Sequence, residues 1–214
     1  MKRTKWVLGR VTAALAVAMG FAAAAAAGEY SVSLASGAGV PMGDFKDAYG
    51  VNWNLNGSGE YEVTALWGLG VDVGYHTWNG KKDYESALAD SVLSYGAAPG
   101  TTVDATFNAF QYGVHGTVRP PMAGPIHPYA QAGIAGYSVK EKLDVSDPAF
   151  AVTDITKTLF GYHLGAGIEY AAAPTIGLGV DARYHTVNTK KDFGSNATWF
   201  AIQGRVTFRI PLAK

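Results

Sequence analysis

The sequence predicts an all-β protein: an eight-stranded antiparallel up-and-down transmembrane β-barrel with short periplasmic turns and longer extracellular loops. Three observations predict it. Apolar and polar residues alternate with a period of two in eight segments, as in strands that have one apolar and one polar face. The connections between these segments are alternately short and long. Behind an N-terminal signal-like segment, no apolar run is long enough for a spanning helix, which leaves a barrel as the membrane-crossing structure.

Residues 1–27 have the pattern of a cleaved secretory signal peptide. A basic start is followed by an apolar stretch over 11–21 and by the alanine run 22–27, which offers several cleavage sites. The alanine-dominated stretch is too short and too weakly apolar for a membrane anchor. The basic residues of this segment are Lys2, Arg3, Lys5 and Arg10. Their loss from a balance of 17 basic and 17 acidic residues leaves residues 28–214, the predicted barrel domain, with a net charge of −4.

Composition excludes several classes of protein. The 214 residues contain no cysteine, which excludes disulfide scaffolds and cysteine-ligated zinc or iron–sulfur sites. No cluster of lysine and arginine is present, so we expect no nucleic-acid partner. The chain has 12 tyrosines, 5 tryptophans and 9 phenylalanines, too many aromatic residues for a disordered chain.

The eight alternating segments have the length of membrane-crossing strands. In the clearest, 160–170, Tyr162 and Leu164 share one face and Gly161 and His163 share the other. Most segments come close to the roughly 9–11 residues that a tilted strand needs to cross a bilayer, and eight is the strand number of the smallest outer-membrane barrels. The expected strands are 29–38, 50–63, 68–78, 107–118, 128–140, 158–170, 176–187 and 198–210.

The connections fall into two groups. Segments 64–67, 119–127 and 171–175 are short, whereas the others are longer and polar, the longest being 79–106. Outer-membrane barrels have short turns on the periplasmic side and longer loops outside the cell. The long connections are therefore predicted to be extracellular.

Aromatic residues on the apolar faces gather near the expected strand ends, which predicts two girdles at the membrane interfaces. The predicted girdle residues are Trp53, Tyr61, Trp67, Tyr75, Tyr112, Tyr162, Tyr170, Tyr184, Trp199 and Phe208. The opposite faces are polar and rich in glycine, which suits a crowded interior. A soluble exported barrel, with the apolar face inward around an apolar ligand, is the alternative.

Charged residues and histidines share the predicted interior. We interpret them as a structural network that fills a narrow barrel, because buried charges are tolerated only when paired. A metal or proton site is the alternative, since imidazole and carboxylate groups are common ligands. We expect no catalytic residue, cofactor or metal. The network residues are Glu60, Glu62, Asp72, His76, His115, Arg119, His163, Glu169, Asp181, Arg183, His185, Arg205 and Arg209.

An internal repeat divides the chain into halves. Residues 68–84 recur at 177–193 with 12 of the 17 positions identical, which indicates two four-stranded units. Each copy holds an Asp-x-x-x-His pair, whose members lie about 13 Å apart on a strand and so make a poor catalytic dyad. Each copy ends in Lys-Lys-Asp-aromatic at the expected outer rim, where the lysines are candidates for contact with lipopolysaccharide phosphates.

Several short motifs suggest a family. The segments Gly37–Gly43, His127-Pro-Tyr-Ala-Gln-Ala-Gly133 and Trp199-Phe…Gly204-Arg-Val-Thr-Phe208 resemble those of small outer-membrane β-barrel proteins of the OmpA-like and opacity type. The resemblance implies an eight-stranded barrel with both termini in the periplasm, located in the outer membrane of a Gram-negative cell. We expect a monomer that contacts outer-membrane lipid and lipopolysaccharide, with an extracellular surface partner at its loops.

Three functions follow as hypotheses. The first is a structural or surface-interaction role carried by the extracellular loops, and the second is a narrow pore for small polar solutes. The third is a lipid A-modifying enzyme, because residues 184–188 are similar to the His-x-Ser-Asn motif of lipid A deacylases. Val187 stands where a serine nucleophile on the face of His185 is needed, so we do not expect an enzyme.

Overall fold

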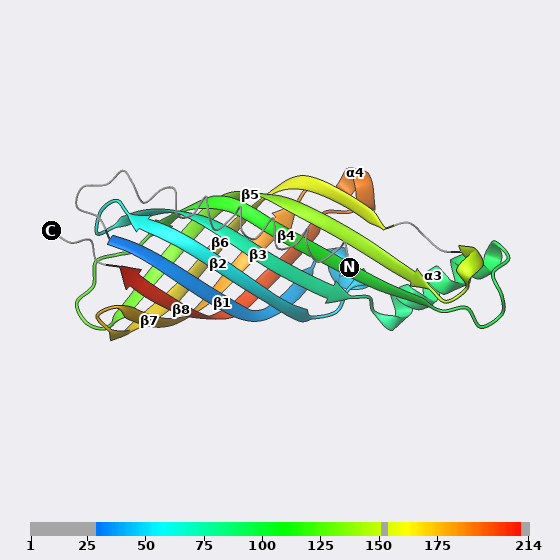
Figure 1. The fold of residues 1–214 in the computed structure, drawn as a ribbon, viewed down its shortest axis with the longest axis horizontal. Helices are drawn as coiled ribbons and strands as arrows, with labels where there is room; N and C mark the ends of the chain where they lie inside the picture. Colours follow the sequence, from blue (N-terminus) through cyan, green and yellow to red (C-terminus); the bar gives the residue numbers. More distant parts are fainter. Residues whose placement is uncertain (1–28, 151–153, 211–214) are drawn as a thin grey trace, which may run out of the picture.

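A computed structural model describes residues 29–150 and 154–210, which form a closed barrel of eight antiparallel strands in chain order (Figure 1). The strands are β1 (Glu29–Met42), β2 (Asn52–Glu62), β3 (Trp67–Asn79), β4 (Val103–Val118), β5 (Ile126–Val145), β6 (Ile155–Ala173), β7 (Ile176–Val187) and β8 (Ala197–Ile210). The predicted fold class is confirmed. The predicted signal peptide, residues 1–27, lies outside the described residues.

The barrel closes between its first and last strands. In β1, Leu34 lies opposite Gly57 of β2 on one side and opposite Val206 of β8 on the other. Closure leaves the sheet without an edge, so the strand backbone is hydrogen-bonded within the protein, as the bilayer core requires. Tyr30 faces Ile210 at one end of the barrel, and this end carries the short turns 63–66, 119–125 and 174–175. It is the periplasmic end.

The helical segments lie at the opposite, extracellular end, and the longest strands extend there (Figure 1). The helical segments are α2 (Phe45–Ala48), α3 (Lys82–Ser94), the 3-10 helix η2 (Pro148–Phe150) and α4 (Lys190–Phe193). Here β4 begins at Val103, β5 continues to Val145 and β6 begins at Ile155, so all three extend beyond their predicted ends. Antiparallel pairing continues past the lipid-facing pattern, because hydrogen bonding between strands does not require one apolar face.

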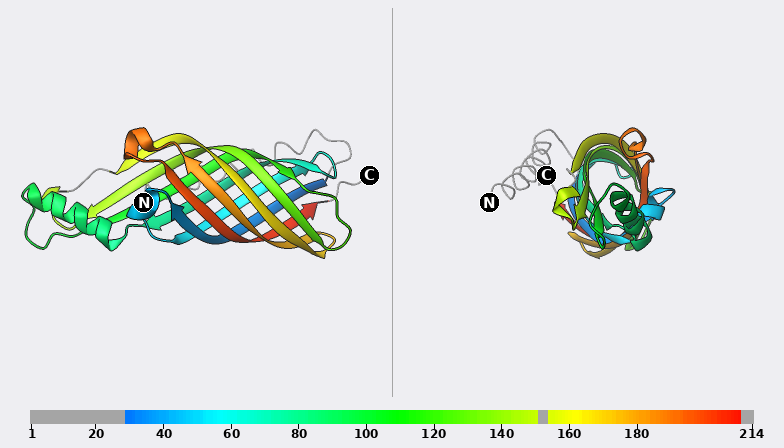
Figure 2. Two further views of the ribbon diagram at one scale, coloured as in Figure 1. Left: turned by 180° about the vertical axis from the view of Figure 1, so that it is seen from behind. Right: turned by 90° about the vertical axis from the view of Figure 1, so that its right-hand side faces the viewer.

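The long connection 79–106, predicted as a loop, contains the helix α3. Its alanines and leucines are good helix formers, and Asp83 and Glu85 lie in the first turn, where the helix dipole favours acidic residues. Its apolar face is narrow, and none of its residues is buried. Seen end-on, α3 lies across the outline of the barrel (Figure 2). No helix within residues 29–150 and 154–210 is long and apolar enough to cross a membrane.

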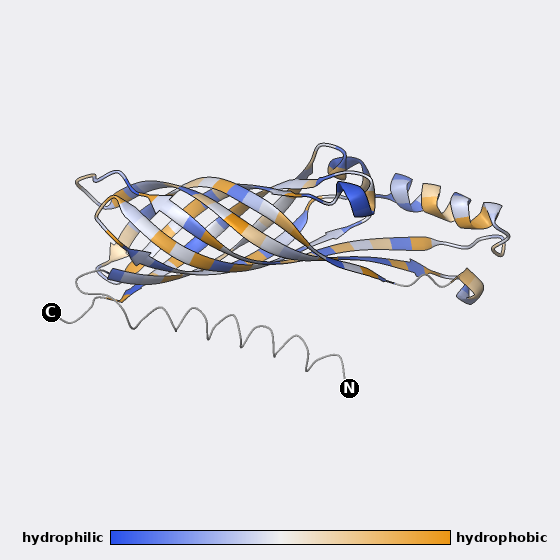
Figure 3. Cartoon of the chain, turned by 90° about the horizontal axis from the view of Figure 1, so that it is seen from above, coloured by the Kyte–Doolittle hydropathy of each residue, from blue (hydrophilic) through white to orange (hydrophobic). Residues whose placement is uncertain are grey.

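Hydropathy alternates along the strands (Figure 3), and the exposures of the residues show an apolar outer surface and a polar interior. Leu69 and Val180 are more than half exposed, whereas Asp72 and Asp181 of the same strands are buried. The predicted girdle residues are partly or fully exposed, except one. Trp199 is fully buried in the interior, so its prediction as a lipid-facing residue is wrong. Its neighbour Phe200 holds the outward position, because adjacent residues of a strand face opposite sides.

A closed barrel makes a simple prediction for gel electrophoresis. Outer-membrane fractions loaded without boiling should show the protein at a different apparent mass from the same fractions after boiling. The reason is that a ladder with no free edge does not unravel in cold detergent. Protein found only in the soluble periplasm, with one migration position in both samples, would contradict the membrane barrel.

Candidate functional site

The interior of the barrel is filled at three successive levels, and the level nearest the periplasm consists of ion pairs. Arg119 is paired with Glu60, and its Nη1 lies 3.9 Å from Glu62 Oε1. Arg209 is paired with Glu169, whose other oxygen accepts a hydrogen bond of 2.5 Å from the hydroxyl of Thr207. The first level thus joins β2 to the residue that follows β4, and β6 to β8, through side chains.

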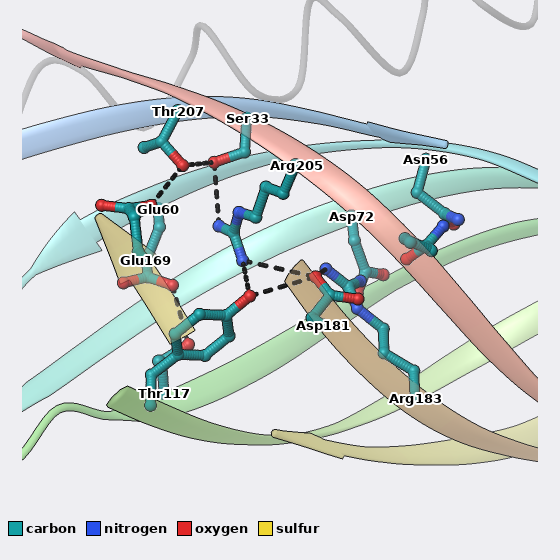
Figure 4. Close-up of polar contacts among 12 residues, drawn as sticks. Ser33, Asn56, Glu60, Asp72, Thr117, Glu169, Asp181, Arg183, Arg205 and Thr207 are labelled. Carbon is teal, nitrogen blue, oxygen red and sulfur yellow. Dashed lines mark hydrogen bonds and ion pairs between the residues drawn. The ribbon is translucent and has the colours of Figure 1, made fainter. Parts of the chain in front are cut away.

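Arg205 extends this network toward the centre of the barrel (Figure 4). It donates to the hydroxyls of Ser33 at 2.8 Å and of Tyr129 at 3.0 Å. Tyr129 in turn donates to Asp181 Oδ2 at 3.0 Å, which also accepts from Arg183 at 3.3 Å. Both guanidinium groups are buried, and these charged hydrogen bonds offset the cost of removing them from water.

Histidines form the middle level around Asp72. The Oδ1 atom of Asp72 lies 3.3 Å from His115 Nδ1 and 3.3 Å from His163 Nε2, and its Oδ2 accepts from Gln111 at 3.2 Å. His115 also reaches Glu60 Oε2 at 3.3 Å. The partners of Asp72 thus come from β4 and β6, whereas His76 of the same Asp-x-x-x-His motif bonds to Gln111 at 3.3 Å.

Glycines on the inward faces make room for these rings. A Cβ atom at Gly133 would lie 2.4 Å from the imidazole of His163, and one at Gly70 would lie 2.6 Å from that of His115. Any larger residue at these positions would displace a histidine. The glycine content of the polar faces therefore has a packing cause, because imidazoles on one strand fill the space left on the next.

The internal repeat brings two equivalent histidines together. His76 and His185 hold the same position in the two copies, and their ring centroids lie 5.1 Å apart in the interior. His185 stacks on Trp199 with 4.9 Å between centroids, and His76 stacks on Trp78 at 5.8 Å. These stacks join the middle level to the one above it.

The third level is a set of aromatic side chains near the extracellular end, which we call the aromatic plug: Phe45, Trp78, Phe107, Tyr137 and Trp199. Each is at most 5% exposed. The rings of Trp78 and Trp199 pack edge to face at 4.9 Å, and Phe45 packs on Trp78 at 5.3 Å. This cluster was not predicted from the sequence, although the alternation of faces along a strand indicates it: Trp78 lies two residues after His76, on the same face.

Above the plug lies a pocket of about 230 Å³, the mouth pocket, lined by residues of α2, α3, α4, β4, β5 and β8. Tyr49 and Tyr84 donate hydrogen bonds to Glu141 Oε1 at 2.6 Å and 3.2 Å. Burial and the Glu141 carboxylate raise the pKa of Tyr84 to about 12, and they raise the pKa of Tyr49 as well. Both phenols therefore remain neutral donors at physiological pH. The two repeat copies end here, in Tyr84 and Phe193.

The other predicted features lie apart from one another. The rim lysines Lys81, Lys82, Lys190 and Lys191 are exposed at the extracellular end, and their contact with lipopolysaccharide stays a prediction. Val187, two residues after His185, is buried. The imidazole of His185 is hydrogen-bonded to the hydroxyl of Tyr137 at 3.0 Å and not to a serine. Among the described residues, no group of three or more histidine and acidic side chains is arranged to hold a metal ion.

Comparisons with known proteins agree with this architecture. Residues 13–206 match the family model described as "Outer membrane protein beta-barrel domain". Among curated proteins, none matches the chain in sequence.

Solved outer-membrane barrels share the fold. OprG from Pseudomonas aeruginosa is similar with a TM-score of 0.56 and 12% identity, over 87% of this chain and 97% of that one. Neisserial surface protein A is similar with a TM-score of 0.54 and 17% identity, over 86% and 99%. Ail from Yersinia pestis, solved with the heparin analogue sucrose octasulfate, reaches a TM-score of 0.50 and 14% identity, over 86% and 100%. The family match and the closed eight-stranded architecture together show that the chain belongs to the outer-membrane protein β-barrel domain family.

Proposed function

We propose that this protein is a closed outer-membrane barrel that acts at the cell surface through its extracellular end and does not conduct solutes. The aromatic plug carries the proposal. Trp78, Tyr137 and Trp199 have no solvent exposure, and their edge-to-face contacts leave no layer of water between them. A solute crossing the barrel would have to displace these rings.

The polar levels below the plug support the same proposal. The interior of an eight-stranded barrel is only about wide enough for its own side chains. Here Arg183 and Arg205 share Asp181, while Arg119 and Arg209 pair with Glu60 and Glu169. Each charge is already partnered, so the network acts as internal packing more readily than as a selectivity filter.

The extracellular end has the form of a projecting platform made of α3 and the extended strands β4 and β5 (Figure 1). Acidic residues outnumber lysines on it. The acidic residues are Asp83, Glu85, Asp90, Asp104, Glu141 and Asp144, and the lysines are Lys82, Lys140 and Lys142. The Ail barrel was solved with a polyanion. The acidic balance here favours a partner that is neutral or positively charged.

A planar lipid bilayer tests whether the barrel conducts. Purified, heat-modifiable protein should add no steady unit currents to the bilayer, whereas a porin purified in the same detergent and used as a positive control should. Reproducible single-channel steps from the wild-type protein would overturn the proposal and support the narrow-pore alternative.

A further inference from the structure

The mouth pocket is an aromatic enclosure built from segments far apart in the chain. Five of its lining residues are aromatic: Phe45, Tyr49, Tyr84, Phe107 and Phe193. Its volume of about 230 Å³ lies just below the roughly 300–1,000 Å³ of pockets that bind drug-sized ligands. The pocket therefore suits a headgroup-sized ligand, not a polymer.

Contacts between the walls fix their geometry. Tyr49 packs on Tyr84 and on Phe107 with centroid distances of 5.7 Å and 5.5 Å, and Phe107 packs on Phe193 at 5.9 Å. Phe45 packs on Phe107 at 5.1 Å and ties the walls to the aromatic plug beneath. The enclosure is thus preorganised, which reduces the entropy lost when a ligand binds.

The charge of the pocket is negative. Glu141 and Asp44 line it, and its lining includes no lysine, arginine or histidine. None of the ion pairs within residues 29–150 and 154–210 involves either carboxylate. The lysines flanking Glu141 are engaged elsewhere, Lys140 with Asp154 and Lys142 with Asp144. A cationic ligand in this pocket would be stabilised by the charge of the unpaired carboxylate and by the aromatic side chains around it.

The hydrogen-bonding groups of the pocket narrow the choice of cation. Oε1 of Glu141 already accepts from two tyrosines. The hydroxyl of Thr189 is also engaged, since it donates to the Ser195 carbonyl and accepts from the amide of Ala197. A primary ammonium needs up to three acceptors, and the carboxylates of the lining offer it only the second oxygen of Glu141 and the exposed Asp44 group. A quaternary ammonium needs no acceptor and binds to aromatic faces, and five of the eleven lining residues are aromatic. We propose that the mouth pocket binds a small quaternary ammonium group that enters from outside the cell.

The proposal goes beyond the surface role above, and it depends only on the mouth of the barrel, so it holds whether or not the lumen conducts. The same ammonium group occurs free, as in choline, and at the end of a phosphocholine lipid headgroup. The two sources differ by a phosphate, which the acidic pocket would disfavour. We therefore expect free choline to bind more tightly than glycerophosphocholine.

Isothermal titration calorimetry on the full barrel in dodecyl maltoside, which carries no ammonium group, tests this proposal. The probes are choline, glycerophosphocholine and 3,3-dimethyl-1-butanol, the neutral carbon analogue of choline. Choline should bind at least about tenfold more tightly than the neutral analogue, a difference of about 1.4 kcal/mol. Glycerophosphocholine binding as tightly as choline would also support the site and would identify a lipid headgroup as its source. No choline binding, or equal binding of the neutral analogue, would overturn it.

Two variants locate the site. Glu141→Gln keeps the shape of the side chain and removes its charge, so choline affinity should fall roughly tenfold. The matched control is Asp144→Asn, which removes a carboxylate three residues along β5 that is outside the pocket lining, and it should bind like the wild type. The heat-dependent gel shift verifies that both variants are folded. Equal affinity in wild type and Glu141→Gln, or equal losses in the two variants, would contradict the assigned site.

Discussion

Replacing both Trp78 and Trp199 by alanine is expected to turn a silent barrel into one that conducts ions. The two rings contact each other at 4.9 Å, and both have no solvent exposure. Their removal takes away the two largest side chains of the aromatic plug and should leave a space that is continuous with the polar interior. Each truncation should also destabilise the barrel by about 3–5 kcal/mol, with a combined loss that is not additive because the residues touch.

Planar-bilayer recordings and denaturant unfolding in lipid vesicles measure the two effects. The matched control replaces Trp53 and Phe200, which face lipid, by alanine. It should stay silent, and it should lose less stability because lipid fills the space that the rings leave. If the double variant does not fold, the single Trp199→Ala variant is used for the recordings. A folded plug variant that remains silent would show that other groups close the barrel.

The second large effect is expected at Asp72. Substitution by alanine removes a buried carboxylate next to His115, His163 and Gln111. The cost should be about 3–5 kcal/mol, as for other buried pairs that lose one partner. Asp72→Asn should cost less, because the amide keeps the volume and one acceptor oxygen.

Urea unfolding in phospholipid vesicles, extrapolated linearly to zero denaturant, measures this cost. The comparison is Asp144→Ala, which breaks the exposed ion pair with Lys142 near the extracellular end of β5. It should change the stability by less than about 1 kcal/mol. Equal losses at Asp72 and Asp144 would show that the interior network contributes no more than a surface ion pair.

The amino-acid sequence by itself determined the number of strands, their order and the two kinds of connection. These features follow from a period of two, which depends only on each residue and its neighbours. The same rule placed Asp72 and His185 on the inward face, and strict parity places Trp199 there too. The continuation of β5 to Val145 and the helix α3 were not predicted. Both lie where no lipid imposes an alternating pattern.

Only the tertiary structure decided which inward side chains meet. His76 and His185 hold equivalent positions in repeat copies more than a hundred residues apart, and they touch because closure of β1 on β8 brings β3 and β7 across one lumen. Tyr84 and Phe193 both line the mouth pocket for the same reason. The stagger of a closed barrel sets the height of every residue along its axis. That stagger is a property of all eight strands together, so contacts across the lumen cannot be read from any one of them.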